Sequence, residues 1–492
     1  MRAQQEIVSD HSVLPEMRRP FVRELQAMEL ALAKGTVKDP TWLAPHDESA
    51  LRWALSLARI SSIQVLPSEG DPCVIQIGHA SDGYRQRLHA MLAPCVGPDA
   101  LVRDGIRAQL GQIRKLCHDE RKAVLRLFGD RLPVRSLDRA TRRRPLALAL
   151  GGGGGTAYVY VGALALLDEV GITPSLIAGS SMGSVLGAFR ARAREFSLGH
   201  VRGLLQRLSW RKVFKLFHTQ SRFGLPATLK LYLREVIGHE FLVEDDGGPR
   251  FLRLNELQIP LRVTIAGLVQ GERPRDVSQY ADLLQGIDNA RELRARWKSL
   301  GRVFAEIARQ PVRPIYVGGD ELTREFDVLD AIGFSSAVPG VIHYDILRDD
   351  PRMVALVTEL IRQHGVWRLV DGGLADNLPA REAWRGVQQG ACGDRDPFVL
   401  ALDAFAPQLT TRHLLFLPLM RIAAENSRGG RMAAHMTVTF KGVLSPLAVV
   451  PGQAEFLRAV ENGRREMQQH VPVIRKMIGP IPDPPGILGD PA

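Results

Sequence analysis

Three short motifs hold the residues whose types and spacing suit ester hydrolysis. The segment Gly179-Ser180-Ser181-Met182-Gly183 fits G-x-S-x-G. In this pattern the glycines let the backbone turn sharply between a strand and a helix, so that the serine hydroxyl projects from the sheet edge. The N-terminus of the following helix favours the negative charge of a developing oxyanion. The motif indicates Ser181 as a nucleophile with Gly179 and Gly183 shaping its turn, although a serine in a purely structural turn fits the same five residues.

A run of glycines, Gly151–Gly155, follows the apolar stretch Leu146–Leu150. A flexible linker would not lie between an apolar strand and an amphipathic helix. The nucleotide-binding patterns do not fit, because no lysine follows the run and G-x-G-x-x-G with its later acidic residue is missing. The remaining interpretation is a nest of backbone N–H donors for an ester oxyanion. Because consecutive parallel strands end at the same sheet edge, we expect this loop beside Ser181.

The third motif, Asp371-Gly372-Gly373, follows the apolar stretch Val366–Val370. An aspartate at a strand end can accept the proton of a serine nucleophile, and we expect its carboxylate within hydrogen-bonding distance of the Ser181 hydroxyl. D-G-G is also a common turn. Serine nucleophiles usually take a histidine as base, and His343, His364, His413 and His435 all follow Ser181, none of them in a distinctive motif. The residues alone therefore leave a Ser–Asp dyad and a Ser–Asp–His triad open.

The elements around these motifs predict an α/β fold with a mainly parallel sheet, because strand, loop and helix patterns alternate. The expected strands are 146–150, 172–179, 261–266, 313–317, 366–370 and 398–402. Residues 1–143 read as a helical N-terminal region of unknown role, with a boundary near Arg142–Pro145. Residues 144–405 form the expected catalytic domain, with a charged helical insertion at about 275–312. Residues 406–492 are expected to be a partly helical extension with a loose tail rich in proline and glycine from Pro480.

Composition narrows the function classes. The chain of 492 residues has a formal net charge of +11, which favours anionic partners. No nucleic-acid-binding motif is visible, so a nucleic acid is not an expected partner. Four scattered cysteines without C-x-x-C spacing argue against a disulfide framework or a zinc site, and no metal or cofactor is expected. No secretory signal or membrane-spanning stretch is visible, so we expect a cytoplasmic protein with peripheral membrane contact.

The order of the three motifs resembles the patatin-like phospholipase family. Four segments carry the resemblance: Leu148–Leu167 with the glycine loop, Ile177–Phe189 around the serine, Phe334–Val341, and Leu369–Pro379 with D-G-G followed by N-x-P. The resemblance covers about residues 145–405 and implies a three-layer α/β/α core, preceded here by the helical region. It further implies hydrolysis of acyl esters of phospholipids and other lipids, without a metal.

By this resemblance Ser181 is the nucleophile and Asp371 the base, without a histidine. Gly152, Gly153 and Gly154 are the implied oxyanion donors. One departure is visible: the family's glycine loop usually continues with arginine and glycine, whereas this chain has Thr156 and Ala157. Threonine cannot supply the positive charge, which keeps a further alternative open, a catalytically silent lipid-binding or scaffold protein with the same fold.

The segment Val201–Phe217 predicts a basic amphipathic helix with aromatic residues. Such a helix can lie in the interface of an anionic membrane, or it can pack on the domain as a cap. Burial of Trp210, Phe214 and Phe217 would favour the cap, and exposure of at least two beside the active site would favour the membrane.

Overall fold

The computed structural model describes residues 21–65, 73–97, 101–207, 209–218, 221–245, 247–269, 310–405 and 417–488. The chain divides into two compact units. The sheet unit contains Ala147–Ala383 and Val399–Gln468, and the helical unit contains Asp10–Leu146, Trp384–Phe398 and Gln469–Ala492. The predicted insertion at 275–312 lies outside the described residues up to position 309.

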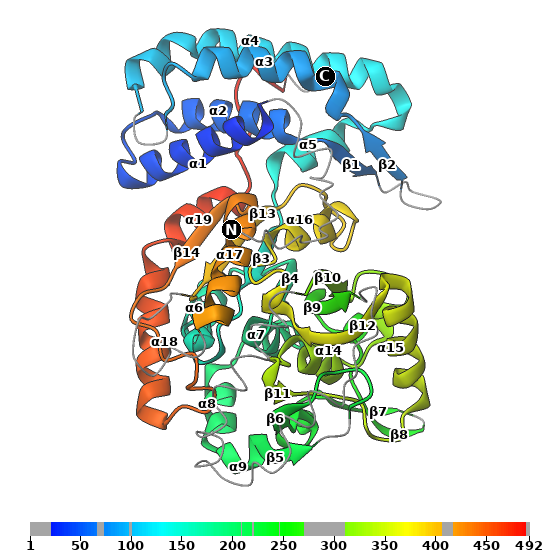
Figure 1. The fold of residues 1–492 in the computed structure, drawn as a ribbon. Helices are drawn as coiled ribbons and strands as arrows, with labels where there is room; N and C mark the ends of the chain where they lie inside the picture. Colours follow the sequence, from blue (N-terminus) through cyan, green and yellow to red (C-terminus); the bar gives the residue numbers. More distant parts are fainter. Residues whose placement is uncertain are drawn as a thin grey trace, which may run out of the picture. The chain divides into compact units, whose positions relative to one another are not determined.

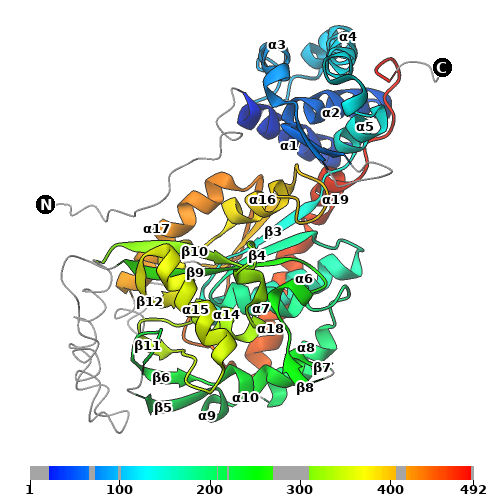
Figure 2. The same ribbon diagram turned by 90° about the vertical axis from the view of Figure 1, so that its right-hand side faces the viewer.

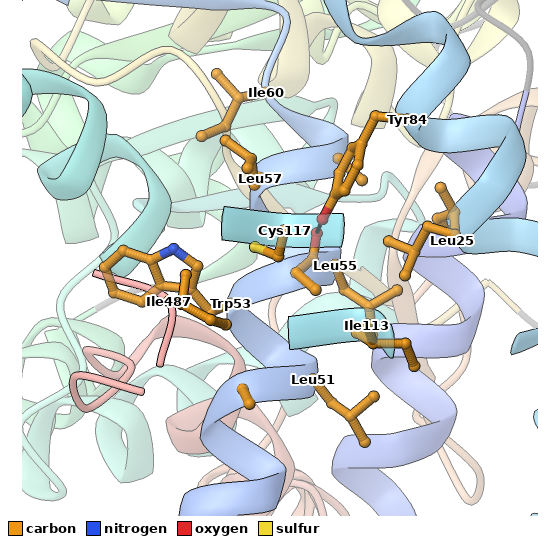
Figure 3. Close-up of a cluster of buried hydrophobic side chains, with 14 of the residues drawn as sticks. Leu25, Leu51, Trp53, Leu55, Leu57, Ile60, Tyr84, Ile113, Cys117 and Ile487 are labelled. Atoms are coloured by element: carbon orange, nitrogen blue, oxygen red, sulfur yellow. Dashed lines mark hydrogen bonds between the residues drawn. The ribbon is translucent and has the colours of Figure 1, made fainter. Parts of the chain in front are cut away.

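Amphipathic helices build the helical unit around one apolar core (Figure 3). They are α1 (Val22–Lys38), α2 (Pro45–Arg59), α3 (Asp82–Leu92), α4 (Arg103–Phe128), α5 (Val134–Arg142) and α19 (Val471–Ile478), beside a hairpin of β1 (Ser62–Val65) and β2 (Cys73–Gln76). Trp53 and Ile487 are fully buried in this core. The prediction of a loose tail from Pro480 is therefore wrong as far as residue 488, because Ile481 and Ile487 pack into the core.

The sheet unit is built on a seven-stranded sheet with the order β10-β9-β4-β3-β13-β14, in which β12 also pairs with β9. Its strands are β3 (Leu146–Leu150), β4 (Leu176–Ser180), β9 (Leu261–Val269), β10 (Val312–Val317), β12 (Val366–Asp371), β13 (Phe398–Asp403) and β14 (Met436–Thr439). All six predicted strands are present. The seventh, β14, was not predicted and comes from the expected C-terminal extension.

Two strands, β4 and β12, pair with the same edge of β9. Strand β4 runs parallel to its first half, up to the pair Ser180 and Thr264. Strand β12 runs antiparallel to its second half and ends at the pair Asp371 and Ile265. Since β10 pairs with residues 263–268 of β9 on the other edge, β4 and β12 must share this one. The C-terminal ends of β4 and β12 therefore meet at neighbouring residues of β9.

Helices cover both faces of the sheet and give a three-layer α/β/α fold (Figure 2). One face carries α6 (Val159–Glu169), α7 (Met182–Ala191), α14 (Val328–Ser335) and α18 (Gln453–Gln468), and the other carries α16 (Ala380–Gln388) and α17 (Leu417–Ala433). The further elements are α8 (Leu198–Arg207), α9 (Trp210–Val213), α10 (Leu233–Ile237), α15 (Pro351–His364), a small sheet of β5 (Phe214–His218), β6 (Ala227–Leu231) and β11 (Gly340–His343), and a hairpin of β7 (Leu242–Asp245) and β8 (Gly248–Phe251). Figure 1 shows α18 alongside α6.

The single helix predicted over Val201–Phe217 is wrong. The segment contains the end of α8, the four-residue helix α9 and the start of β5. The apolar residues after Val213 belong to a strand, since Phe214 pairs with Leu231 of β6.

Two chemical expectations can be compared with the described residues. All four cysteines are free thiols. None of the described helices is both long enough and apolar enough to cross a membrane.

Candidate active site

Ser181 lies on the sharp turn between β4 and α7. Its backbone has a φ of 50° and a ψ of −128°, a conformation in which a side chain is strained. Neither Gly179 nor Gly183, the two glycines that flank this turn, has room for a Cβ atom. A Cβ at Gly179 would lie 2.6 Å from Cα of Ser184, and one at Gly183 would lie 2.3 Å from the carbonyl oxygen of Leu150. The close packing therefore holds the serine where β4 ends and α7 begins.

The turn is also fixed from the side by α14. The hydroxyl of Ser335 accepts a hydrogen bond from the backbone N–H of Ser181 (2.9 Å) and donates one to the carbonyl of Thr264 in β9 (2.6 Å). Two residues further, the carbonyl of Ala337 accepts the backbone N–H of Asp371 (2.8 Å). Segment 334–341 carries part of the family resemblance, but nothing in its residues indicated that Ser335 would hold the backbone of Ser181.

Asp371 faces Ser181 across the junction of β4 and β12. Ser181 Oγ donates to Asp371 Oδ2 at 2.6 Å, and the backbone N–H of Gly373 donates to Asp371 Oδ1 at 2.8 Å. Burial raises the pKa of Asp371 to about 6, while the hydrogen bonds from Ser181 and Gly373 oppose the rise. The two side chains lie within the distance that the sequence interpretation expected. At neutral pH the carboxylate is mostly ionised and can accept a proton.

The glycine loop lies next to Ser181, as its position after β3 predicted. A Cβ at Gly152 would lie 3.0 Å from Cβ of Ser181. The N–H of Gly152 already donates to the carbonyl of Asn377 (3.0 Å), so Gly152 does not fit the donor role predicted for it. Within the described part of the chain, the N–H groups of Gly153 and Gly154 donate to no protein acceptor. These two amides are the candidate oxyanion donors.

Asn377 and Thr156 hold the ends of this loop. Asn377 belongs to the N-x-P that follows D-G-G; its side chain donates to Ser427 (2.9 Å) while its carbonyl receives Gly152. Thr156 is fully buried, and its hydroxyl donates to the carbonyl of Gly153 (3.0 Å). Thr156 therefore contributes a hydrogen bond within the loop at the position where the family resemblance expected an arginine.

Part of the chain matches a known protein family. Residues 148–384 match the model of the family described as Patatin-like phospholipase. These residues form a patatin-like phospholipase domain. The family indicates an enzyme, a lipid acyl hydrolase. No curated protein matches the chain.

A large apolar pocket opens onto Ser181 of the patatin-like domain. Its volume is about 290 Å³. Helix α7 and the small sheet supply much of its wall, through Val185, Leu186, Phe189, Phe214, Leu229 and Leu231. The polar side chains at its lining include Ser181, Asp371, Asn377 and Ser336, and no lysine, arginine or histidine is among the described lining residues.

The described histidines take other partners. Nδ1 of His343 contacts the carbonyl of Leu225 (2.8 Å), and Nδ1 of His435 accepts the backbone N–H of Val399 (2.8 Å). His364 ends helix α15, and His413 lies outside the described residues. None of the described histidines lines the pocket, and none hydrogen-bonds to Ser181 or Asp371.

A cluster of carboxylates elsewhere in the patatin-like domain has the spacing of a metal site. Asp327, Asp330 and Asp350 offer oxygen atoms within 4.8 Å of one another. Arg234 bonds Asp327 and Asp330 at 2.6 and 2.7 Å, and Arg348 bonds Asp330 and Asp350 at 2.7 and 2.6 Å. Arg352 also pairs with Asp327, so three guanidinium groups balance the three carboxylates and the cluster fits a structural ion-pair network better than a cation site.

Proposed function

We propose that the sheet unit hydrolyses acyl esters of lipids, with Ser181 as nucleophile and Asp371 as its base. The observation that carries this proposal is the 2.6 Å hydrogen bond from Ser181 Oγ to the buried carboxylate of Asp371, beside two unused amide donors. A nucleophile, a base with a pKa of about 6 and an oxyanion site within one junction are the groups that acyl transfer requires.

The reaction proceeds in two steps. Asp371 takes the hydroxyl proton as Ser181 Oγ attacks the ester carbonyl carbon, and the amides of Gly153 and Gly154 stabilise the oxyanion. When the tetrahedral intermediate collapses, the alcohol leaves with the proton from Asp371. Asp371 then deprotonates a water molecule, which attacks the acyl-serine ester and releases the fatty acid, while Ser181 recovers its proton.

The lining of the pocket indicates which part of the substrate enters it. A wall of aliphatic and aromatic side chains without a described cation favours an acyl chain and disfavours a phosphate group. We infer that the acyl chain occupies the pocket between α7 and the small sheet. The alcohol or headgroup then extends from the serine toward solvent.

Two large exposed side chains at the pocket suit a lipid surface. Trp210 is 47% exposed and Leu447 is 45% exposed, and both line the pocket. Arg211 and Lys212 are exposed next to Trp210. Phe214, in contrast, is buried, and the side chain of Phe217 is not described. Segment 201–217 therefore contributes Phe214 to the pocket wall and Trp210 to an exposed rim that could touch an anionic membrane.

Reaction with a fluorophosphonate probe tests the enzyme proposal. The wild-type protein should be labelled and should hydrolyse long-chain p-nitrophenyl esters, whereas Ser181→Ala should do neither. Ser184→Ala is a matched control, because that hydroxyl bonds the carbonyl of Ser181 and not Asp371. An unlabelled, inactive wild type that still binds lipid would favour the silent binding protein. Loss of activity in a histidine variant such as His413→Ala, with the fold intact, would favour the triad.

Vesicle sedimentation tests the rim. We expect binding to vesicles with anionic lipid, weaker binding in high salt, and weaker binding by Trp210→Ala. Leu127→Ala in α4 is a control, because Leu127 is 67% exposed but belongs to the helical unit. Equal binding to neutral and anionic vesicles would refute the electrostatic part of this proposal.

A further inference from the structure

The glycine loop is held by a segment that lies well beyond the family match, which ends at residue 384. This segment, Val443–Val450 between β14 and α18, is called the 443–450 loop here. The N–H of Gly155 donates to the carbonyl of Pro446 at 3.0 Å. At Gly154, where φ is 57°, a Cβ would lie 2.3 Å from the same carbonyl oxygen. The backbone of the 443–450 loop therefore packs directly against one of the two candidate oxyanion donors.

A second contact fixes the far end of the glycine loop. The buried hydroxyl of Tyr158 donates to the carbonyl of Val449 at 2.6 Å. Residues Gly154–Tyr158 form a single 3₁₀ turn, so both ends of this turn bond to the 443–450 loop. The Tyr158 ring also packs edge-on against Phe456 of α18, with centroids 5.8 Å apart.

The 443–450 loop is itself anchored by backbone contact between two helices. A Cβ at Gly162 of α6 would lie 1.9 Å from the carbonyl oxygen of Val460, and one at Gly463 of α18 would lie 1.8 Å from that of Val159. Each helix thus has a glycine where the other approaches most closely, and neither position has room for a methyl group. Helix α18, which follows the 443–450 loop, therefore cannot shift along α6 without a clash.

We propose that the 443–450 loop, through Tyr158 and the Pro446 carbonyl, positions the oxyanion amides of Gly153 and Gly154. It thus supports, from a distant segment, a glycine loop in which this chain has Thr156 in place of the family's arginine. This inference rests on the proposed function. Tyr158 is a positioning residue, because it acts through the backbone of the glycine loop.

Removal of one hydroxyl tests the proposal. Tyr158→Phe keeps the ring and its packing but loses the bond to Val449. Tyr84→Phe is a matched control, because the Tyr84 hydroxyl is also buried and donates to a backbone carbonyl, that of Ala54 (2.9 Å), in the helical unit. We expect Tyr158→Phe to lower kcat about tenfold with KM within about twofold, since displaced amides stabilise the oxyanion poorly while phenylalanine keeps the ring that Tyr158 gives to the pocket wall. Tyr84→Phe should leave kcat unchanged, even if it lowers Tm as much as Tyr158→Phe does.

Hydrogen exchange gives a readout that does not depend on activity. Amides in residues 151–158 should exchange faster in Tyr158→Phe than in the wild type, and at the wild-type rate in Tyr84→Phe. Unchanged exchange and unchanged kcat in Tyr158→Phe would overturn the positioning role. If the wild type hydrolyses no ester, the proposed function fails, whereas unchanged exchange beside an active wild type refutes only the role of the loop.

Discussion

Two buried aspartates, one in each unit, differ in their partners. Asp396 in the helical unit contacts the guanidinium of Arg59, and Arg144 lies close enough to favour its ionised form. Among the described residues, the hydrogen-bond partners of the Asp371 carboxylate in the sheet unit are neutral: the hydroxyl of Ser181 and the amide of Gly373. Burial raises the pKa of both carboxyls, but arginine opposes the rise at Asp396 and hydrogen bonds alone oppose it at Asp371.

Under the proposed function, this difference separates the structural carboxylate of Asp396 from the reactive one of Asp371. Arginine favours the ionised form of an aspartate beside it, and its guanidinium group does not give up a proton to that aspartate. An aspartate beside a hydroxyl, with its pKa near neutrality, can both take up and release a proton. Three predictions below test this comparison and a fourth compares helix packing in the two units, from the largest expected effect to the smallest.

Asp371→Asn should lower kcat by about 10³-fold or more, because an amide cannot accept the Ser181 proton. The fold should persist, since asparagine keeps the shape and the acceptor for the Gly373 amide. Initial rates on a soluble ester, with circular dichroism as the check on folding, measure this. Activity within tenfold of wild type would show that Asp371 is not the base.

Asp396→Ala should cost about 3 kcal/mol of folding free energy, because it leaves buried arginine without its acid. Arg59→Met combined with Asp396→Leu should recover most of this loss, since apolar residues replace the buried pair while Arg144 keeps its ion pair with Glu29. Urea denaturation measures both. A double variant as unstable as the single one would mean that volume, and not charge, sets the cost.

Asp371 should also make stability depend on pH. Its pKa rises from 3.8 to about 6 on folding. Its contribution to the free energy of unfolding is therefore fully present below pH 4 and is lost as pH rises through 6. Asp371→Asn should therefore match wild type near pH 4 and become more stable by up to about 3 kcal/mol at pH 8. For the same reason kcat/KM of the wild type should rise with pH around 6. A pH-independent stability difference would contradict this linkage.

The smallest effects concern helix glycines in the two units. Gly463→Ala should destabilise by about 2 kcal/mol, because its methyl group meets the carbonyl of Val159. A Cβ at Gly111 of α4 would have no atom within 4 Å. Gly111→Ala should therefore stabilise the fold by about 0.5–1 kcal/mol through helix propensity. Chemical denaturation of both variants measures this. Equal effects of the two substitutions would show that α6 and α18 separate easily.

Sequence predicted the parts of the fold and site that depend on side-chain type. The six apolar strands follow from hydrophobic periodicity, and Ser181, Asp371 and the glycine loop follow from motifs. The helix–strand change near Val213 was missed, because Val201–Phe217 has apolar spacing that fits a helix although Phe214 begins a strand. A pattern of polar and apolar residues does not show where the pairing partner, here β6, will lie.

Several of the other misses involve backbone atoms. Gly152 was expected to be an oxyanion donor, but its N–H donates to the backbone carbonyl of Asn377. No side-chain pattern in the sequence indicates this bond between two backbone groups. The carbonyls of Pro446 and Val449 likewise have no signature in the sequence. Strand β14 is short, and only its parallel pairing with β13 makes it part of the sheet. These features depend on contacts between distant segments.

The pairing of β4 and β12 along one edge of β9 has a consequence for how this chain can vary. Ser181 and Asp371 are 190 positions apart. Their meeting is set by Thr264 and Ile265, two consecutive residues of a single strand. Insertions between these segments can therefore accumulate without separating the two side chains, as long as β9 keeps its length. A deletion of one residue within β9 would instead move them out of reach, so β9 should tolerate changes in residue type far better than changes in length.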